Sequence, residues 1–139
     1  MSFNTPDLSD ENPEARALSP ILKNLGGKKV FWGKIETLQC PDDNSFVKEL
    51  FNSEGEGKVL VVDAKGISSV ALLGDLIAEA GVKNNWSGIV INGYVRDIDI
   101  LSKLDIGVQA LGTIPVRSEK KNQGPVSYTH LTLPTNREV

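Results

Sequence analysis

Apolar runs alternate with amphipathic segments through the middle of the chain. Residues 59–63 and 87–93 are too apolar to face water on either side and predict buried strands, and residues 106–118 predict a third strand with a Pro-containing exit. Residues 71–85 and 97–105 carry apolar side chains at helical spacing. The predicted inner face of the first of these helices is Leu73, Leu76, Ile77 and Ala80. Strands and helices in this order imply parallel strands joined by right-handed crossovers, so we expect an α/β fold.

The first third of the chain gives three further predictions. Apolar residues recur at helical spacing before two glycines and predict a helix over residues 17–27, with Leu18, Ile21, Leu22 and Leu25 on one face. Near alternation over residues 29–40 predicts a half-buried strand. Residues 42–57 open with Asp and Asn, which favour helix N-caps, and predict a helix that ends at glycines.

Composition and charge exclude several classes of function. The 139 residues have a net charge of −3 with no long run of one sign, so we expect no nucleic-acid partner, and an anionic substrate would need local positive charge or a metal. The single Cys40 excludes an internal disulfide and a cysteine-only zinc site. No apolar stretch is long enough to span a membrane and the N-terminus is not signal-like, so we expect a cytoplasmic protein.

The C-terminal segment, VSYTHLTLPTNREV, has a different character. Residues 126–139 resemble the translation of a common sequencing adaptor, which predicts a single native domain over residues 1–125; a genuine C-terminal strand is the alternative. The segment contains His130, the only histidine, so a Ser-His-Asp triad or a two-His zinc site has no basis. Carboxylates, Arg, Lys, hydroxyls and backbone groups remain, and oxygen-rich sites favour a hard cation such as Mg²⁺ or Mn²⁺.

Candidate site residues gather where the predicted strands end. Ligands of parallel α/β sheets bind beyond the carboxyl ends of the strands, where Asp63, Arg96, Asp97 and the turn at residues 112–113 are expected. The adjacent Arg96 and Asp97 could also be a solvated ion pair, or Asp97 could cap a helix.

The start of the helix after LLG is a second candidate. Its free backbone N–H groups would form an anion site, made of Gly74, Asp75, Leu76 and Ile77. The turn DAKGISS, in contrast, has one glycine where a dinucleotide loop needs three.

Four stretches of the sequence resemble one family. NLGGKKVFWGKIETLQCPDDN, GKVLVVD, ALLGDLIAEAGVKNNWSGIVINGYVRDIDIL and LDIGVQALGTIPVRSEKK are similar to the RraA-like family, which includes 4-hydroxy-4-methyl-2-oxoglutarate aldolases and RraA regulators of ribonuclease E. Aldolase members are marked by an Asp, twenty intervening residues and Arg-Asp, and here Asp75 precedes Arg96-Asp97 at that spacing.

The resemblance implies a swivelling β/β/α sandwich, here without its C-terminal strands, assembled as a trimer or dimer of trimers. It implies a class II aldolase that cleaves 4-hydroxy-4-methyl-2-oxoglutarate or 4-carboxy-4-hydroxy-2-oxoadipate to pyruvate and a second 2-oxo acid, with oxaloacetate decarboxylation as a side activity. On this resemblance Asp97 holds the divalent cation and Arg96 binds the carboxylate or enolate. The N–H groups of Gly74 to Ile77 receive the carboxylate, and Asp75 orders water at the cation or accepts a proton.

Two alternatives and one departure accompany the resemblance. A regulator of ribonuclease E that acts by protein binding shares the fold, but those regulators lack the complete Arg-Asp pair. A menaquinone-pathway methyltransferase, a label sometimes attached to the family, would need a glycine-rich cofactor loop that the sequence lacks. After Asp63 the family usually carries glycines, whereas this chain has Ala64 and Lys65.

Overall fold

A parallel sheet forms the centre of the protein in the computed structural model, which describes residues 4–118. The strands are β1 (Lys23–Asn24), β2 (Ile35–Gln39), β3 (Val59–Asp63), β4 (Gly88–Val95) and β5 (Gly107–Thr113). Their order is β1-β5-β4-β3-β2, with β2 to β5 parallel and β1 antiparallel to β5. The α/β prediction is therefore confirmed.

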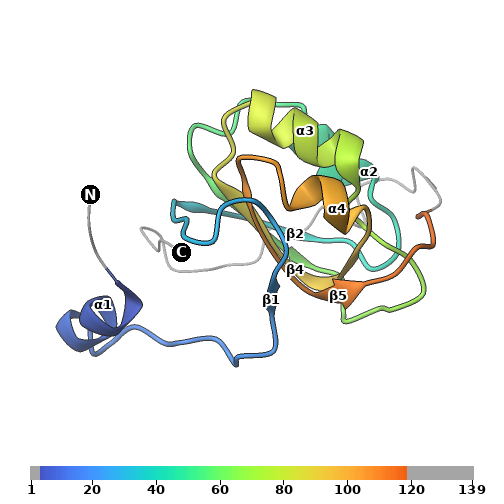
Figure 1. Cartoon of the computed structure of the whole chain (residues 1–139). Coiled ribbons are helices and arrows are strands. Elements are labelled where there is room, and N and C mark those ends of the chain that lie inside the picture. Colours follow the sequence, from blue (N-terminus) through green and yellow to red (C-terminus); the bar gives the residue numbers. More distant parts are fainter. Residues whose placement is uncertain (1–3, 119–139) are drawn as a thin grey trace.

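The helices are α1 (Thr5–Glu11), α2 (Ser45–Phe51), α3 (Asp75–Lys83) and α4 (Ile98–Leu101). Helices α2, α3 and α4 lie over one face of the sheet, while α1 lies away from it and buries no residue (Figure 1). Residues 4–118 thus contribute a sheet and a layer of helices. The predicted adaptor-derived tail at residues 126–139, and the alternative of a genuine strand there, lie outside the described residues. None of the helices in this range is long and apolar enough to cross a membrane.

The core lies between the sheet and these helices. Its largest fully buried side chains include Phe51 from α2, Leu60 from β3 and Ile89 and Ile91 from β4. Strand β3 matches the predicted strand at residues 59–63, because a run that is apolar on both sides can be satisfied only in the middle of a covered sheet.

The predicted helix over residues 17–27 is wrong. The segment has no helix, and Leu18 and Ile21 are 70% and 60% exposed. Leu25 instead donates its backbone N–H to the carbonyl of Val108 at 2.8 Å, and β1 pairs with β5. A Cβ on Gly26 would collide with the backbone of residues 106 and 108, so this glycine allows close approach to β5 rather than ending a helix.

Three other elements are present but shorter than the sequence pattern predicted. The strand predicted over residues 29–40 begins only at Ile35, since Val30 and Trp32 are exposed. The helix predicted over residues 97–105 is limited to Ile98–Leu101. Helix α2, predicted within residues 42–57, is confirmed at Ser45–Phe51.

The predicted inner face of α3 is partly wrong. Leu73 is buried and Ile77 packs against the core, whereas Leu76 is 75% exposed, and the helix itself buries Ala78 and Gly81. The helix begins at Asp75 rather than at residue 71, which turns Leu76 outward. Gly81 lies against Phe51, whose ring would be 2.5 Å from an added Cβ, so the absent side chain lets α2 and α3 pack closely.

Candidate active site

The segment before α3 runs beside the carboxyl end of β4. Leu72 donates its backbone N–H to the carbonyl of Tyr94 at 2.9 Å, and Arg96 donates its N–H to the carbonyl of Leu73 at 3.0 Å. These bonds hold the start of α3 against the residues that follow β4. Two parts of the sequence that were candidates separately are thereby brought together.

Some of the first backbone N–H groups of α3 donate to carboxylates of the site, and others have no acceptor in the described part of the chain. Asp75 donates its N–H to Oδ2 of Asp97 at 3.2 Å, and Leu76 donates its N–H to Oδ1 of Asp75 at 2.8 Å. In the described part of the chain, the N–H groups of Gly74 and Ile77 have no backbone or side-chain acceptor. Two of the four predicted anion donors therefore hold the carboxylates, and two remain available to a ligand.

Asp97 occupies the N-cap position of α4 but does not cap it. Its side chain makes no cap hydrogen bond, and its backbone is left-handed, with φ 58° and ψ 41°. Its Oδ2 lies 3.7 Å from Nε of Arg96, and both side chains are about one-third exposed, so the pair contributes little stability in itself. A strained backbone at a residue whose carboxylate turns toward another segment favours a functional role.

Gly74 is required by the same arrangement. A Cβ at this position would lie 2.9 Å from Oδ2 of Asp97 and 3.4 Å from Nε of Arg96. The glycine therefore lets the start of α3 approach the Arg-Asp pair.

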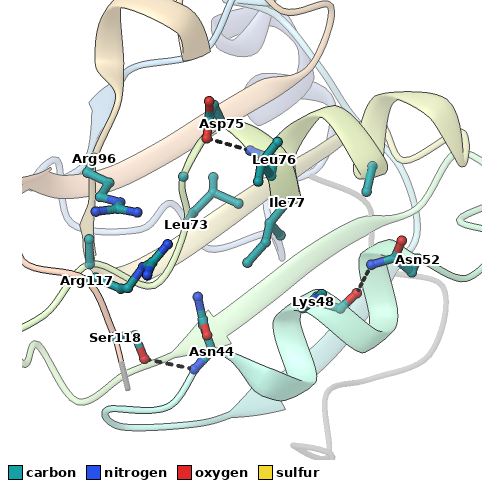
Figure 2. A pocket seen from close by; sticks show the side chains of 13 residues that line it. Asn44, Lys48, Asn52, Leu73, Asp75, Leu76, Ile77, Arg96, Arg117 and Ser118 are labelled. Carbon is teal, nitrogen blue, oxygen red and sulfur yellow. Dashed lines mark hydrogen bonds between the residues drawn. The ribbon is translucent and has the colours of Figure 1, made fainter. Parts of the chain in front are cut away.

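A pocket of about 670 Å³ opens beside the start of α3 (Figure 2). Four of the predicted residues on α3, Gly74 to Ile77, line it together with Arg96. Its other polar lining residues are Asn44, Lys48, Asn52, Arg117 and Ser118. Asp97 is not among the lining residues. It contacts two residues that are, because it accepts the N–H of Asp75 and lies beside the guanidinium of Arg96.

The pocket is locally basic although the chain is acidic overall. Three cationic side chains, Lys48, Arg96 and Arg117, line it with one carboxylate, Asp75, against a net charge of −3 for the chain. The local positive charge that an anionic substrate requires is therefore present.

The other candidates at the strand ends do not line the pocket. Asp63 accepts hydrogen bonds from the N–H of Lys65 at 2.9 Å and from Nδ2 of Asn92 at 3.1 Å. Partial burial alone would raise the pKa of Asp63, but the hydrogen bonds from Lys65, Asn92 and Gln39 outweigh it and hold the pKa below its usual value. Asp63 thus orders the turn after β3, and Thr113 lies outside the pocket as well.

The carboxylates fit a hydrated hard cation. No group of three or more His, Cys, Asp and Glu side chains within residues 4–118 could hold a metal. Asp97 and Asp75 are nevertheless linked at the start of α3, and Mg²⁺ in proteins is often held by one or two carboxylates together with water and substrate oxygens. This donor set suits a cation that binds with its substrate.

Sequence reasoning missed five polar residues of the pocket, which are Asn44, Lys48, Asn52, Arg117 and Ser118. Arg117 follows β5, just as Arg96 follows β4, so the rule that placed Arg96 at the sheet edge could have found it. Asn44 follows β2 in the same way. Lys48 lies within α2 and has no comparable signal, because only the packing of α2 beside α3 brings it to the pocket.

The sequence matches the RraA-like family, described as Aldolase/RraA, over residues 5–135. The chain belongs to the RraA-like family. Among curated relatives, proteins from Pseudomonas syringae pv. tomato and Shewanella oneidensis are each 49% identical, over 138 and 123 residues. The alignments cover 96% and 88% of this chain and 85% and 75% of those proteins, and both proteins bear the provisional name 4-hydroxy-4-methyl-2-oxoglutarate aldolase.

Two solved structures show the same fold. The RNA-processing inhibitor RraA from Thermus thermophilis is 39% identical with a TM-score of 0.85, over 88% of this chain and 75% of that chain. A protein from Geobacillus kaustophilus named S-adenosylmethionine:2-dimethylmenaquinone methyltransferase is 37% identical with a TM-score of 0.83, over 87% of this chain and 76% of that chain. The family and the fold of the chain are thus established. The similar proteins, in contrast, are named for three different activities.

Proposed function

We propose that this RraA-like protein is a divalent-metal-dependent aldolase. Its substrate is 4-hydroxy-4-methyl-2-oxoglutarate or 4-carboxy-4-hydroxy-2-oxoadipate, which it cleaves to pyruvate and a second 2-oxo acid. The observation that carries the proposal is the contact between Asp75 and Asp97 at the start of α3, beside Arg96 and a basic pocket. The curated relatives named as aldolases support it.

Arg96 and the start of α3 bind the 2-oxo acid end of the substrate. The guanidinium of Arg96 lines the pocket and has no side-chain partner other than Asp97 among residues 4–118. Its planar donors suit a carboxylate or an enolate oxygen. The N–H groups of Gly74 and Ile77 provide further donors, and the helix dipole favours the negative charge there.

Asp97 would hold the cation, directly or through water, and Asp75 would order a water molecule at the cation. A divalent cation bound there supplies stabilisation of the negative charge that develops on the 2-oxo oxygen. Asp97 also accepts the N–H of Asp75, so its carboxylate keeps α3 in register with Arg96. Mg²⁺ or Mn²⁺ would suit this site as the cofactor.

Carbon-carbon cleavage begins with loss of the proton on the 4-hydroxyl group. Asp75, on the pocket wall, accepts this proton directly or through water. The C3–C4 bond breaks, C4 becomes the carbonyl carbon of the departing 2-oxo acid, and the electron pair forms the enolate of pyruvate. Arg96 faces the developing charge, and protonation at C3 gives pyruvate. Decarboxylation of oxaloacetate yields the same enolate and is the expected side activity.

Release of pyruvate from 4-hydroxy-4-methyl-2-oxoglutarate tests this proposal. We expect release with added Mg²⁺ and a loss of at least tenfold in the presence of a chelator. Absence of metal-dependent pyruvate release would contradict the aldolase function.

A second candidate function is the regulation of RNA processing by protein binding. The solved structure from Thermus thermophilis is named an RNA-processing inhibitor and has a TM-score of 0.85 to this chain. Co-purification of the chain with ribonuclease E, together with inhibition of its RNA cleavage, would support this candidate. In either case we propose a trimer or a dimer of trimers, which light scattering would measure.

A further inference from the structure

Five polar residues of the pocket have no part in the proposed bond cleavage. Three of them are Asn44 before α2, Lys48 within α2 and Arg117 after β5, and the others are Asn52 and Ser118. Figure 2 shows them on the side of the pocket away from Asp75, with Arg96 and Arg117 both extending into the space between. The pocket therefore has polar groups at two ends.

Asn44 is built into this second end. Its residue is only 9% exposed, and its side-chain Oδ1 is buried without a hydrogen-bond partner in the described chain. The backbone of Asn44 is held, because its N–H donates to Oγ of Ser118 at 3.2 Å and Ser118 donates to the carbonyl of Asp42 at 2.9 Å. A buried amide left without a partner is costly, so a ligand that hydrogen-bonds to it gains affinity.

The same contacts position the cations. Arg117 precedes Ser118 and follows Val116, whose carbonyl accepts the N–H of Ala71 at 2.8 Å, so the segment is anchored to both walls of the pocket. Among residues 4–118, neither Lys48 nor Arg117 forms an ion pair. Two cations without an ion pair, together with the unpartnered buried Oδ1 of Asn44, suit an anion that binds with a water molecule.

We propose that Asn44, Lys48 and Arg117 form a second subsite that binds the far carboxylate of a dicarboxylic 2-oxo acid. Lys48 and Arg117 hold the carboxylate, and a water molecule bound beside it donates to Oδ1 of Asn44. Arg96 and the start of α3 hold the 2-oxo acid end. This inference rests on the proposed function and adds a reason for the substrate to carry charge at both ends.

Two ligands of equal chain length test the second subsite. 2-Oxoglutarate and 2-oxopentanoate share the 2-oxo acid end and differ in a carboxylate against a methyl group at the far end. Binding of each to the full chain is measured by calorimetry in buffer with MgCl₂. We expect 2-oxoglutarate to bind roughly tenfold more tightly.

Single substitutions assign this preference. Lys48→Gln and Arg117→Gln should each weaken the binding of 2-oxoglutarate by roughly tenfold. The affinity for 2-oxopentanoate should change by less than about twofold. Lys48→Arg should restore binding of the dicarboxylate, since it keeps the charge. Lys103→Gln, at an exposed lysine outside the pocket, is the matched control, and thermal unfolding establishes that each variant is folded.

The outcomes separate the two proposals. Equal binding of the two ligands, or unchanged 2-oxoglutarate binding in both Lys48→Gln and Arg117→Gln, would overturn the second subsite and leave the aldolase proposal standing. If neither ligand binds to the unmodified chain, the second subsite falls together with the proposed 2-oxo acid site.

Discussion

Asp75 and Asp97, separated by 22 positions in the sequence, meet where the backbone N–H of the first donates to Oδ2 of the second at 3.2 Å. The contact joins the start of α3 to the residue after Arg96. The Asp97 carboxylate thereby holds the start of α3, where the side chain of Asp75 lines the pocket. The candidate chemistry depends on this junction.

A substitution can remove the charge of Asp97 and keep its hydrogen bond to the N–H of Asp75. We expect Asp97→Asn to change the free energy of unfolding by less than about 0.5 kcal/mol, because Asn tolerates left-handed backbone and its amide oxygen can accept the N–H of Asp75. Pyruvate release should fall by about 100-fold, because a charge that acts on the transition state is lost. Asp99→Asn, at a neighbouring exposed acid outside the pocket, is the control and should retain activity. Equal activity in Asp97→Asn and the unmodified chain would remove Asp97 from the site.

Gly74 and Gly81 offer a contrast between function and stability. In Gly74→Ala the Cβ meets the ends of two flexible side chains, Asp97 and Arg96, so activity should fall at least tenfold while stability changes by less than about 1 kcal/mol. In Gly81→Ala the Cβ meets the buried ring of Phe51, so the free energy of unfolding should fall by about 1–3 kcal/mol. Denaturant unfolding and pyruvate release measure both. A Gly74→Ala variant with full activity would contradict the close approach.

Lys65 is a site of backbone strain away from the pocket. It has φ 57°, in the left-handed region, at a position where the resemblance implies glycine. Lys65→Gly keeps the N–H that Asp63 accepts and should raise the free energy of unfolding by up to about 1 kcal/mol. Lys103→Gly, at a residue without positive φ, should instead lower it by about 0.5–1 kcal/mol. Destabilisation by Lys65→Gly would argue against strain at this turn.

Cys40 gives the fold a measurable dependence on alkaline pH. Burial, and then the negative charges of Asp43, Asp63 and Asp42, raise the pKa of its thiol from 9.0 to about 12. Between these values the unfolded chain loses the proton first, so the free energy of unfolding should fall by up to about 1.4 kcal/mol per pH unit. Denaturant unfolding from pH 8 to pH 10.5 should show a steeper fall for the unmodified chain than for Cys40→Ala. Parallel curves for the two proteins would contradict the raised pKa.

Local sequence patterns predicted the central strands of the sheet. They did not predict its edge strand β1 or the full set of residues that line the pocket. The run at residues 59–63 is apolar on both sides, which only a central strand accommodates. Leu18 and Ile21 have helical spacing but lie on a segment whose neighbours bond to β5, and such a tertiary contact leaves no mark in local periodicity.

The candidate site divides in the same way. Arg96 and Asp97 were predicted because both follow an obvious strand and because the resemblance names their spacing to Asp75. Lys48 was missed, since its position in the pocket depends on how α2 packs beside α3. A sequence pattern predicts which residues lie at the end of a strand. The residues that line a pocket between two helices depend on how those helices pack, which the pattern does not predict.

The stoichiometry of pyruvate release tests the central claim most directly. Cleavage of 4-hydroxy-4-methyl-2-oxoglutarate between C3 and C4 yields two molecules of pyruvate for each substrate consumed. We expect this ratio for the unmodified chain with Mg²⁺, with the rate reduced by about 100-fold in Asp97→Asn and unchanged in Asp99→Asn. Substrate that is not consumed, or pyruvate release that is equal in the unmodified chain and Asp97→Asn, would contradict the account.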